Sequence, residues 1–133
     1  DISANAIFSA MTVSSARYTK IGRLVTATCY ISTPSSFSTT SAYSAGGGLY
    51  IAGLPFASSG SGADYQATTI AYYTAWQGFA PPKAPVGWTQ ASATNIVLHY
   101  SGGSAGIVSV LPQSTINAAG ASIILTVTYQ TNS

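Results

Sequence analysis

The residues best suited to bind a ligand gather in one stretch, YYTAWQGFAPPKAPVGWTQ, at residues 72–90. Both tryptophans of the chain, Trp76 and Trp88, lie here, with Phe79 between them. Three prolines stiffen the stretch, so that less conformational entropy is lost when a ligand orders it. Aromatic rings suit the apolar C–H faces of sugars, and nearby donors suit the hydroxyls. The donors available here are Gln77, Lys83 and Gln90.

A carboxylate precedes this stretch. Asp64 is the only internal acidic residue, and Tyr65 follows it. Asp64 could accept two sugar hydroxyls, pair with a cation, or be a solvated turn residue. Structural alternatives also stay open for the two tryptophans, since Trp76 could close a core and Trp88 could seal a loop against it. The candidate ligand-binding residues are therefore Asp64, Tyr65, Trp76, Gln77, Phe79, Lys83, Trp88 and Gln90.

The chain has few acidic or histidine side chains that could act as catalytic acids or bases. The chain has no Glu, and its only carboxylate side chains are Asp1 and Asp64. Paired-carboxylate hydrolysis, a calcium cage, a two-metal site and an Asp-based triad each need more than this. His99 and Cys29 lie on separate predicted elements, and a lone His is usually structural. We therefore expect no enzyme, no catalytic residue, no metal site and no cofactor; a depolymerase is the weaker alternative.

The charge content excludes further classes of partner. Only 5% of the 133 residues are charged, and the net charge is +2. Four cations are too few for a nucleic-acid footprint, and no apolar run reaches the 18 residues of a membrane span. Arg17, Lys20 and Arg23 flank one predicted hairpin, where they suit solubility, a subunit contact or an acidic glycan. Cys29 is expected to be a small buried hydrophobic residue, as in a protein made in a reducing cytosol.

The elements that must position these residues are strands. SIILTVTYQT alternates, with Ile123, Leu125, Val127 and Tyr129 on one face, and LVTATCYI groups Val25, Ala27, Cys29 and Ile31 in the same way. TNIVLHYS does so with Ile96, Leu98 and Tyr100, opposite Val97 and His99. Shorter candidate strands are 6–13, 48–54, 66–76 and 106–111.

These strands predict one antiparallel β-sandwich or jelly roll over residues 1–133, with an up-and-down barrel as the alternative. Turn-rich stretches separate the strands, and no helical apolar stripe persists. RYTKIGRLVT predicts a hairpin whose tight turn is either Ile21-Gly22 or Gly22-Arg23.

The second face of several strands is less polar than a solvent-facing sheet surface should be. Leu24 and Tyr30 share a face with threonines, and Tyr72 adds another aromatic ring. Antiparallel sheets usually expose one polar face. Apolar residues on that face therefore predict that another copy of the chain covers it.

Three segments resemble the C-terminal domains of bacteriophage tail fibres and tailspikes. They are YTKIGRLVTATCYIS, GLYIAGLPFASS and LPQSTINAAGASIILTVTYQT, in this order within residues 15–131. The resemblance implies a homotrimeric jelly roll of the C1q and tumour-necrosis-factor type at the C-terminal tip of a longer fibre. It also implies a virion protein that is made in the host cytoplasm and works outside the cell in host attachment. Residues 64–93 match no pattern of the family.

Together these observations predict a trimeric tip that binds a host surface polysaccharide or lipopolysaccharide. A shallow aromatic site with a Kd of about 1 mM gives about −4 kcal/mol, and linking such sites raises avidity by roughly 10² to 10⁴. The main alternative is a structural trimerisation or capping module that touches no receptor. A small capsid or pilin-like shell subunit would use the same fold.

Overall fold

The chain folds into antiparallel β-strands in a computed structural model that describes residues 12–33, 49–60, 65–75, 83–102, 109–110 and 120–132. No helix occurs among these residues. The strands are β1 (Thr12–Ile21), β2 (Leu24–Ser32), β3 (Leu49–Ala52), β4 (Ala67–Thr74), β5 (Ala84–Thr89), β6 (Asn95–Ser101), β7 (Ser109–Val110) and β8 (Ser122–Gln130).

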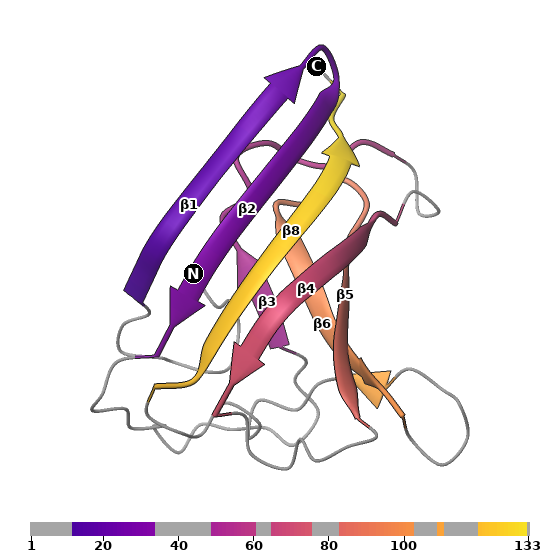
Figure 1. The fold of residues 1–133 in the computed structure, drawn as a ribbon. Helices are drawn as coiled ribbons and strands as arrows, with labels where there is room; N and C mark the ends of the chain where they lie inside the picture. Colours follow the sequence, from indigo (N-terminus) through magenta and orange to yellow (C-terminus); the bar gives the residue numbers. More distant parts are fainter. Residues whose placement is uncertain are drawn as a thin grey trace, which may run out of the picture.

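All eight strands belong to one sheet that curls into two layers. The strand order is β1-β2-β8-β4-β5-β6-β3, and β7 pairs with β6 beside this path. Figure 1 shows β1, β2, β8 and β4 as one layer, with β5, β6 and β3 behind it. β4 pairs with β8 on one side and β5 on the other, so it joins the two layers. The predicted antiparallel β-sandwich is confirmed.

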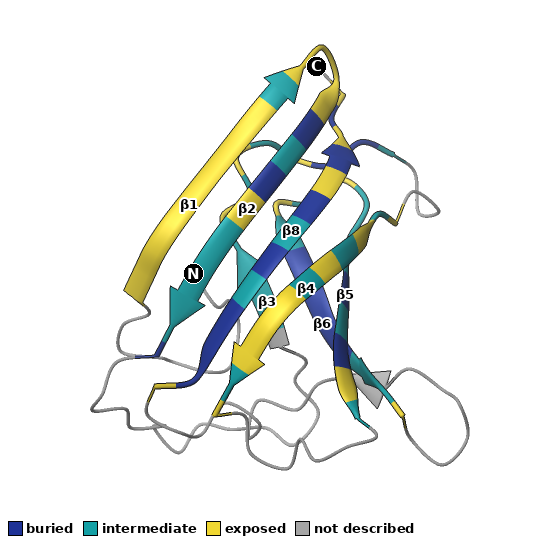
Figure 2. Cartoon of the chain, in the orientation of Figure 1, coloured by how far each residue is buried: buried dark blue, intermediate teal, exposed yellow. Residues whose placement is uncertain are grey.

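The core lies between the layers and follows the predicted alternation. Ala27 is paired with Val127, and Cys29 with Leu125, so that inward residues of β2 and β8 are neighbours. Ile96 and Leu98 of β6 meet them from the other layer and are buried. Figure 2 shows the resulting alternation of buried and less buried positions along β2 and β8. The predicted inward faces of β2, β6 and β8 are therefore confirmed.

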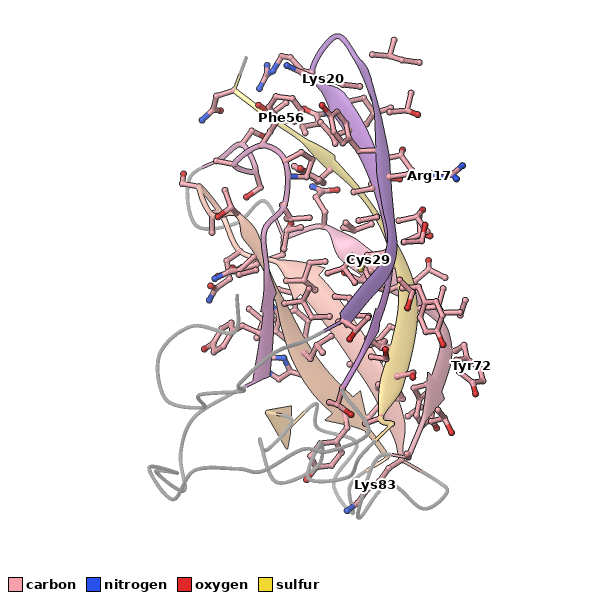
Figure 3. The ribbon with its side chains drawn as sticks, turned by 90° about the vertical axis from the view of Figure 1, so that its left-hand side faces the viewer. Arg17, Lys20, Cys29, Phe56, Tyr72 and Lys83 are labelled. Carbon is pink, nitrogen blue, oxygen red and sulfur yellow. The ribbon has the colours of Figure 1, made fainter. Side chains whose placement is uncertain are left out.

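Tyr129 ties the core to the segment after β3. Its ring is fully buried, and its hydroxyl donates to the Phe56 carbonyl at 3.0 Å. The Phe56 backbone N–H donates to the same hydroxyl at 3.4 Å. Phe56 in turn contacts β1, since its ring meets Tyr18 edge to face and lies under the Lys20 ammonium, 4.5 Å from the ring centroid. A single phenylalanine thus connects both layers near the hairpin, as Figure 3 shows for Lys20 and Phe56.

The hairpin between β1 and β2 uses the second of the two predicted turns. Ile21 pairs with Leu24, so Gly22 and Arg23 form the two-residue turn. Gly22 has a φ of +58°, which a tight hairpin turn of this type requires. Arg23 Nε donates to the Thr131 carbonyl at 2.8 Å, which fixes the turn against the end of β8.

β5 corrects one expectation. The sequence predicts a turn-rich stretch at FAPPKAPVG, residues 79–87, because prolines and glycines usually interrupt strands. Residues 84–89 form a strand instead: Val86 and Trp88 alternate with Pro85 and Gly87, and the whole strand pairs with β6. Pro85 is tolerated near the beginning of the strand, where fewer backbone donors are needed.

Gly87 is required by the close approach of β6. A Cβ atom at this position would lie 3.1 Å from Leu98 Cδ2 and 3.2 Å from Ile96 Cγ2. Both neighbours are buried and have little room to move. We expect Gly87→Ala to lower the free energy of unfolding by about 1–3 kcal/mol, as crowding in a packed core does. Urea unfolding measures this, and an unchanged midpoint would contradict the tight packing of β5 on β6.

The structure describes the shorter predicted strands only in part. The strands expected at 48–54, 66–76 and 106–111 contain β3, β4 and β7. Most of the strand expected at 6–13 lies outside the described residues. In the described ranges, no helix is long and apolar enough to cross a membrane.

Cys29 is half-buried, whereas the sequence predicted a small buried residue. Its side chain packs against the core from β2, and its thiol is free. Burial raises the pKa of the Cys29 thiol to about 11. Because the thiolate is the reactive form, we expect slow modification by a disulfide reagent at pH 8 in the native protein and rapid modification in urea. Equal rates in both conditions would show that the thiol is open to solvent.

Candidate functional site

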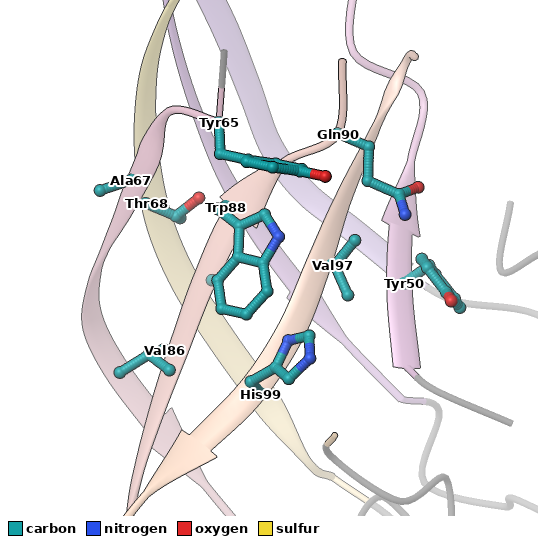
Figure 4. A pocket seen from close by; sticks show the side chains of 10 residues that line it. Tyr50, Tyr65, Ala67, Thr68, Val86, Trp88, Gln90, Val97 and His99 are labelled. Atoms are coloured by element: carbon teal, nitrogen blue, oxygen red, sulfur yellow. The ribbon is translucent and has the colours of Figure 1, made fainter. Parts of the chain in front are cut away.

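A hollow of about 900 Å³ lies on the outer face of the β5–β6 layer. Figure 4 shows the side chains around it, with Trp88 and His99 beside each other and Tyr50 and Gln90 across from them. Its described lining is mainly aromatic, aliphatic and uncharged, and consists of Tyr50, Tyr65, Ala67, Thr68, Val86, Gly87, Trp88, Gln90, Val97 and His99.

Three rings pack in series along this hollow. Trp88 stacks on His99, with ring centroids 4.0 Å apart and an angle of 18° between the planes. Tyr65 meets Trp88 edge to face, at 6.5 Å between centroids. Such pairs restrain each other's rotamers, so the indole is held in place before any ligand arrives. Because His99 covers part of one face of the Trp88 ring, that part of the indole is not open to a ligand. The indole therefore forms a side wall of the hollow.

The strand register brings these side chains together. Trp88 pairs with Val97 and Val86 with His99, so all four point to the same side of the β5–β6 pair. Tyr50 of β3 pairs with Val97 from the opposite side and therefore shares this face.

Two hydrogen bonds hold the Tyr65 segment beside β5. The Thr89 N–H donates to the Gln66 carbonyl at 3.0 Å, and the Gln66 N–H donates to Thr89 Oγ1 at 3.2 Å. Tyr65 itself is 54% exposed, so its ring remains accessible at the rim. The segment before β4 thus supplies a ligand-accessible ring whose backbone is fixed.

The described lining of the hollow contains hydrogen-bonding groups but no charged side chain. The polar groups of its lining include the Trp88 indole N–H, the Gln90 amide and the hydroxyls of Tyr50 and Tyr65. The Gln90 backbone is fixed separately, because its carbonyl accepts a hydrogen bond from the Ser58 hydroxyl. An apolar wall with a few convergent donors and acceptors is typical of sites for small uncharged ligands.

Burial lowers the pKa of His99 below its ordinary value of 6.5. The unfolded chain therefore binds a proton more readily than the folded one, and stability falls as pH decreases through 6.5 toward the lower folded value. We expect the unfolding midpoint to decrease between pH 7.5 and pH 5, and the decrease to be smaller in His99→Gln. A pH dependence that is identical in this variant would assign the effect to other groups.

The structure brings together some of the predicted ligand-binding residues. Tyr65, Trp88 and Gln90 line the hollow. Lys83 does not belong to the described lining, and its ammonium lies 5.2 Å from the ring centroid of Tyr100. The other predicted members, Asp64, Trp76, Gln77 and Phe79, lie outside the described residues.

Sequence reasoning missed Tyr50 and His99 as lining residues. His99 was expected to be structural, although its place on one face with Val97 was predicted correctly. The sequence does not show which side chains lie beside this face of β6. They are set by the pairing of β6 with β3 and β5. Within the described ranges no group of His, Cys, Asp or Glu side chains could hold a metal ion.

Comparisons with known proteins give one fold-level relation. No protein-family model matches the chain, and no curated protein matches its sequence. The crystal structure of the Dettilon tailspike protein (gp208) is similar, with a TM-score of 0.63 and 18% sequence identity over 90% of this chain. The chain corresponds to 22% of the length of that protein. This fold is therefore similar to that of a domain in a phage tailspike.

Proposed function

We propose that this chain is a phage tail-fibre or tailspike domain that trimerises and binds a host cell-surface glycan through the Trp88 hollow. The aromatic, uncharged hollow on the outer face of β5 and β6 carries the proposal. Its volume of about 900 Å³ lies within the range of about 300–1,000 Å³ that small-ligand pockets occupy. The fold similarity to a tailspike and the resemblance of three sequence segments support the same assignment.

The glycan is a polysaccharide or lipopolysaccharide of the host surface. Sugar rings have apolar faces that suit the Trp88 and Tyr65 rings, and their hydroxyls suit the Gln90 amide. A glycan array probed with the purified protein tests this, with binding to at least one bacterial surface oligosaccharide as the expected result. Absence of binding to every such glycan and to susceptible cells would overturn it.

The proposal of a trimer rests on the outer face of the layer formed by β1, β2, β8 and β4. Ile21, Leu24 and Tyr72 are 76%, 47% and 49% exposed, which is unusual for large apolar side chains on one sheet face. Figure 3 shows Tyr72 and Arg17 on this side, pointing away from β5 and β6.

Between these residues the same face carries threonine pairs. Thr26 and Thr128 share a hydrogen bond of 3.0 Å between their hydroxyls, and so do Thr28 and Thr126. Paired hydroxyls leave fewer unmet polar groups when the face is covered. A second and a third copy of the chain are the occupants we propose for it.

A charge on this face should therefore disrupt assembly. We expect the double variant Leu24→Glu, Tyr72→Glu to be monomeric by light scattering at micromolar concentration, while the unaltered protein is trimeric. Thr94→Glu, on an exposed turn of the other layer, is the control and should remain trimeric. A monomeric unaltered protein, or a double variant that stays trimeric, would contradict the proposed interface.

The structural module without receptor contact is the second candidate. The exposed apolar face favours it as much as it favours a binding tip, since both need a trimer. Binding distinguishes the two, because a capping module would trimerise and show no affinity for host glycans or cells.

A further inference from the structure

Two buried polar atoms without hydrogen-bond partners belong to residues that line the hollow. Among the described residues, three buried side-chain atoms have no hydrogen-bond partner: Thr68 Oγ1, Asn95 Oδ1 and His99 Nδ1. Thr68 and His99 both line the hollow. Such an atom lowers stability, so its retention calls for a functional explanation.

His99 is the better placed of the two lining residues. It is only 9% exposed, and its ring is fixed by stacking on Trp88. β5 presents Val86 and Trp88 to it, and β3 presents Tyr50, so the described lining around the ring holds no charged group. A polar ring held rigidly in an apolar wall can determine which ligand fits.

The unpartnered Nδ1 atom determines the tautomer. A neutral imidazole carries its proton on one nitrogen and a lone pair on the other. A buried N–H without an acceptor is rarer in proteins than a buried acceptor without a donor. The lone pair therefore belongs on Nδ1 and the proton on Nε2, the nitrogen nearer the tip of the side chain.

We infer that His99 is a specificity-determining residue of this hollow, whose Nε2–H donates a hydrogen bond to an oxygen of an uncharged sugar held against Trp88 and Tyr65. This inference rests on the proposed glycan binding. It names the ligand class, because the described lining holds no cation to neutralise a carboxylate or sulfate. Protonation of His99 would bury a second N–H at Nδ1 without an acceptor, so the ring remains a neutral donor.

The tautomer can be measured without any ligand. Long-range proton–nitrogen NMR correlations of the unaltered, uniformly labelled protein distinguish the two nitrogens of its single histidine. The expected result at pH 7.5 is a neutral ring with the proton on Nε2. A ring protonated on Nδ1, or a charged ring, would overturn the inference whatever the protein binds.

Three variants then test the role in binding. A glutamine amide nitrogen reaches near Nε2, an asparagine amide reaches only near Nδ1, and phenylalanine keeps the stacking and loses both nitrogens. Against the neutral oligosaccharide selected on an array, His99→Gln should retain affinity within about threefold, and His99→Asn and His99→Phe should each lose about tenfold. All three should remain folded oligomers by circular dichroism and light scattering.

The outcomes separate this inference from the proposed function. If the unaltered protein binds a glycan and His99→Phe binds equally well, the role of His99 is wrong and the glycan site stands. If the array selects only acidic glycans, the uncharged ligand class is wrong. If the unaltered protein binds no glycan at all, both the proposed function and this inference fail.

Discussion

Leu125→Asp is expected to abolish soluble folded protein. Leu125 lies on β8 between β2 and β4, is 1% exposed and pairs with Cys29 and Ile70. A carboxylate at this position would have no described cation or donor within the core. The cost of several kcal/mol for an unpaired buried charge approaches the total stability of about 5–15 kcal/mol of a small domain. Soluble yield and near-ultraviolet circular dichroism measure the outcome.

Thr94→Asp is the control for this substitution. Thr94 lies on an exposed bend between β5 and β6, outside the proposed trimer interface, so the new carboxylate stays in water. The control should fold with a loss of stability of less than about 1 kcal/mol, as exposed substitutions usually do. A well-folded Leu125→Asp variant would mean that the assigned inward face of β8 is wrong.

Trp88→Ala is expected to weaken glycan binding by about 1–3 kcal/mol, which is roughly fivefold to 150-fold in Kd. The indole contacts both Tyr65 and His99, so its removal takes away the central wall of the hollow and the ring that restrains its neighbours. Trp88 lies on the outer face of β5 and is only partly buried. Its removal therefore leaves the core between the two layers complete. Titration of the array-selected oligosaccharide measures the change.

Tyr73→Ala is the control for loss of an aromatic ring elsewhere. Tyr73 is an exposed residue of β4 and is absent from the described lining of the hollow. This variant should bind with unaltered affinity and should have the same oligomeric state as Trp88→Ala. Equal affinity of Trp88→Ala and the unaltered protein would remove the hollow from the binding site, and the structural capping module would then be the better account.

The inward faces of β2, β6 and β8 could be predicted from the sequence because their alternation is strict. Ile123, Leu125, Val127 and Tyr129 are separated by single, mostly polar residues, and a strand places such a series on one side. The fold class followed from the same pattern. The curling of a single sheet into two layers did not, because it depends on which strands pair.

β5 could not be predicted because local signals opposed it. Pro85 and Gly87 are typical of loops, yet Gly87 is needed where Leu98 and Ile96 approach the backbone. The close approach belongs to β6, which lies about ten residues further along the chain. Tertiary packing therefore decided the conformation against the local preference.

The candidate site could be predicted only in part for the same reason. Trp88, Tyr65 and Gln90 were selected by residue type, and they do line one hollow. Tyr50 and His99 complete it through pairing between strands that are far apart in the sequence. Lys83 was selected as a donor among the aromatic rings of its stretch; it is outside the described lining, and its ammonium lies 5.2 Å from the ring centroid of Tyr100.

A crystal structure of the protein with the array-selected oligosaccharide tests the central claim most directly. It should show a sugar ring in the hollow, in contact with Trp88 and Tyr65, with one of its oxygens within hydrogen-bonding distance of His99 Nε2. An oligosaccharide bound in full occupancy on another surface, with the hollow containing only water, would contradict the claim.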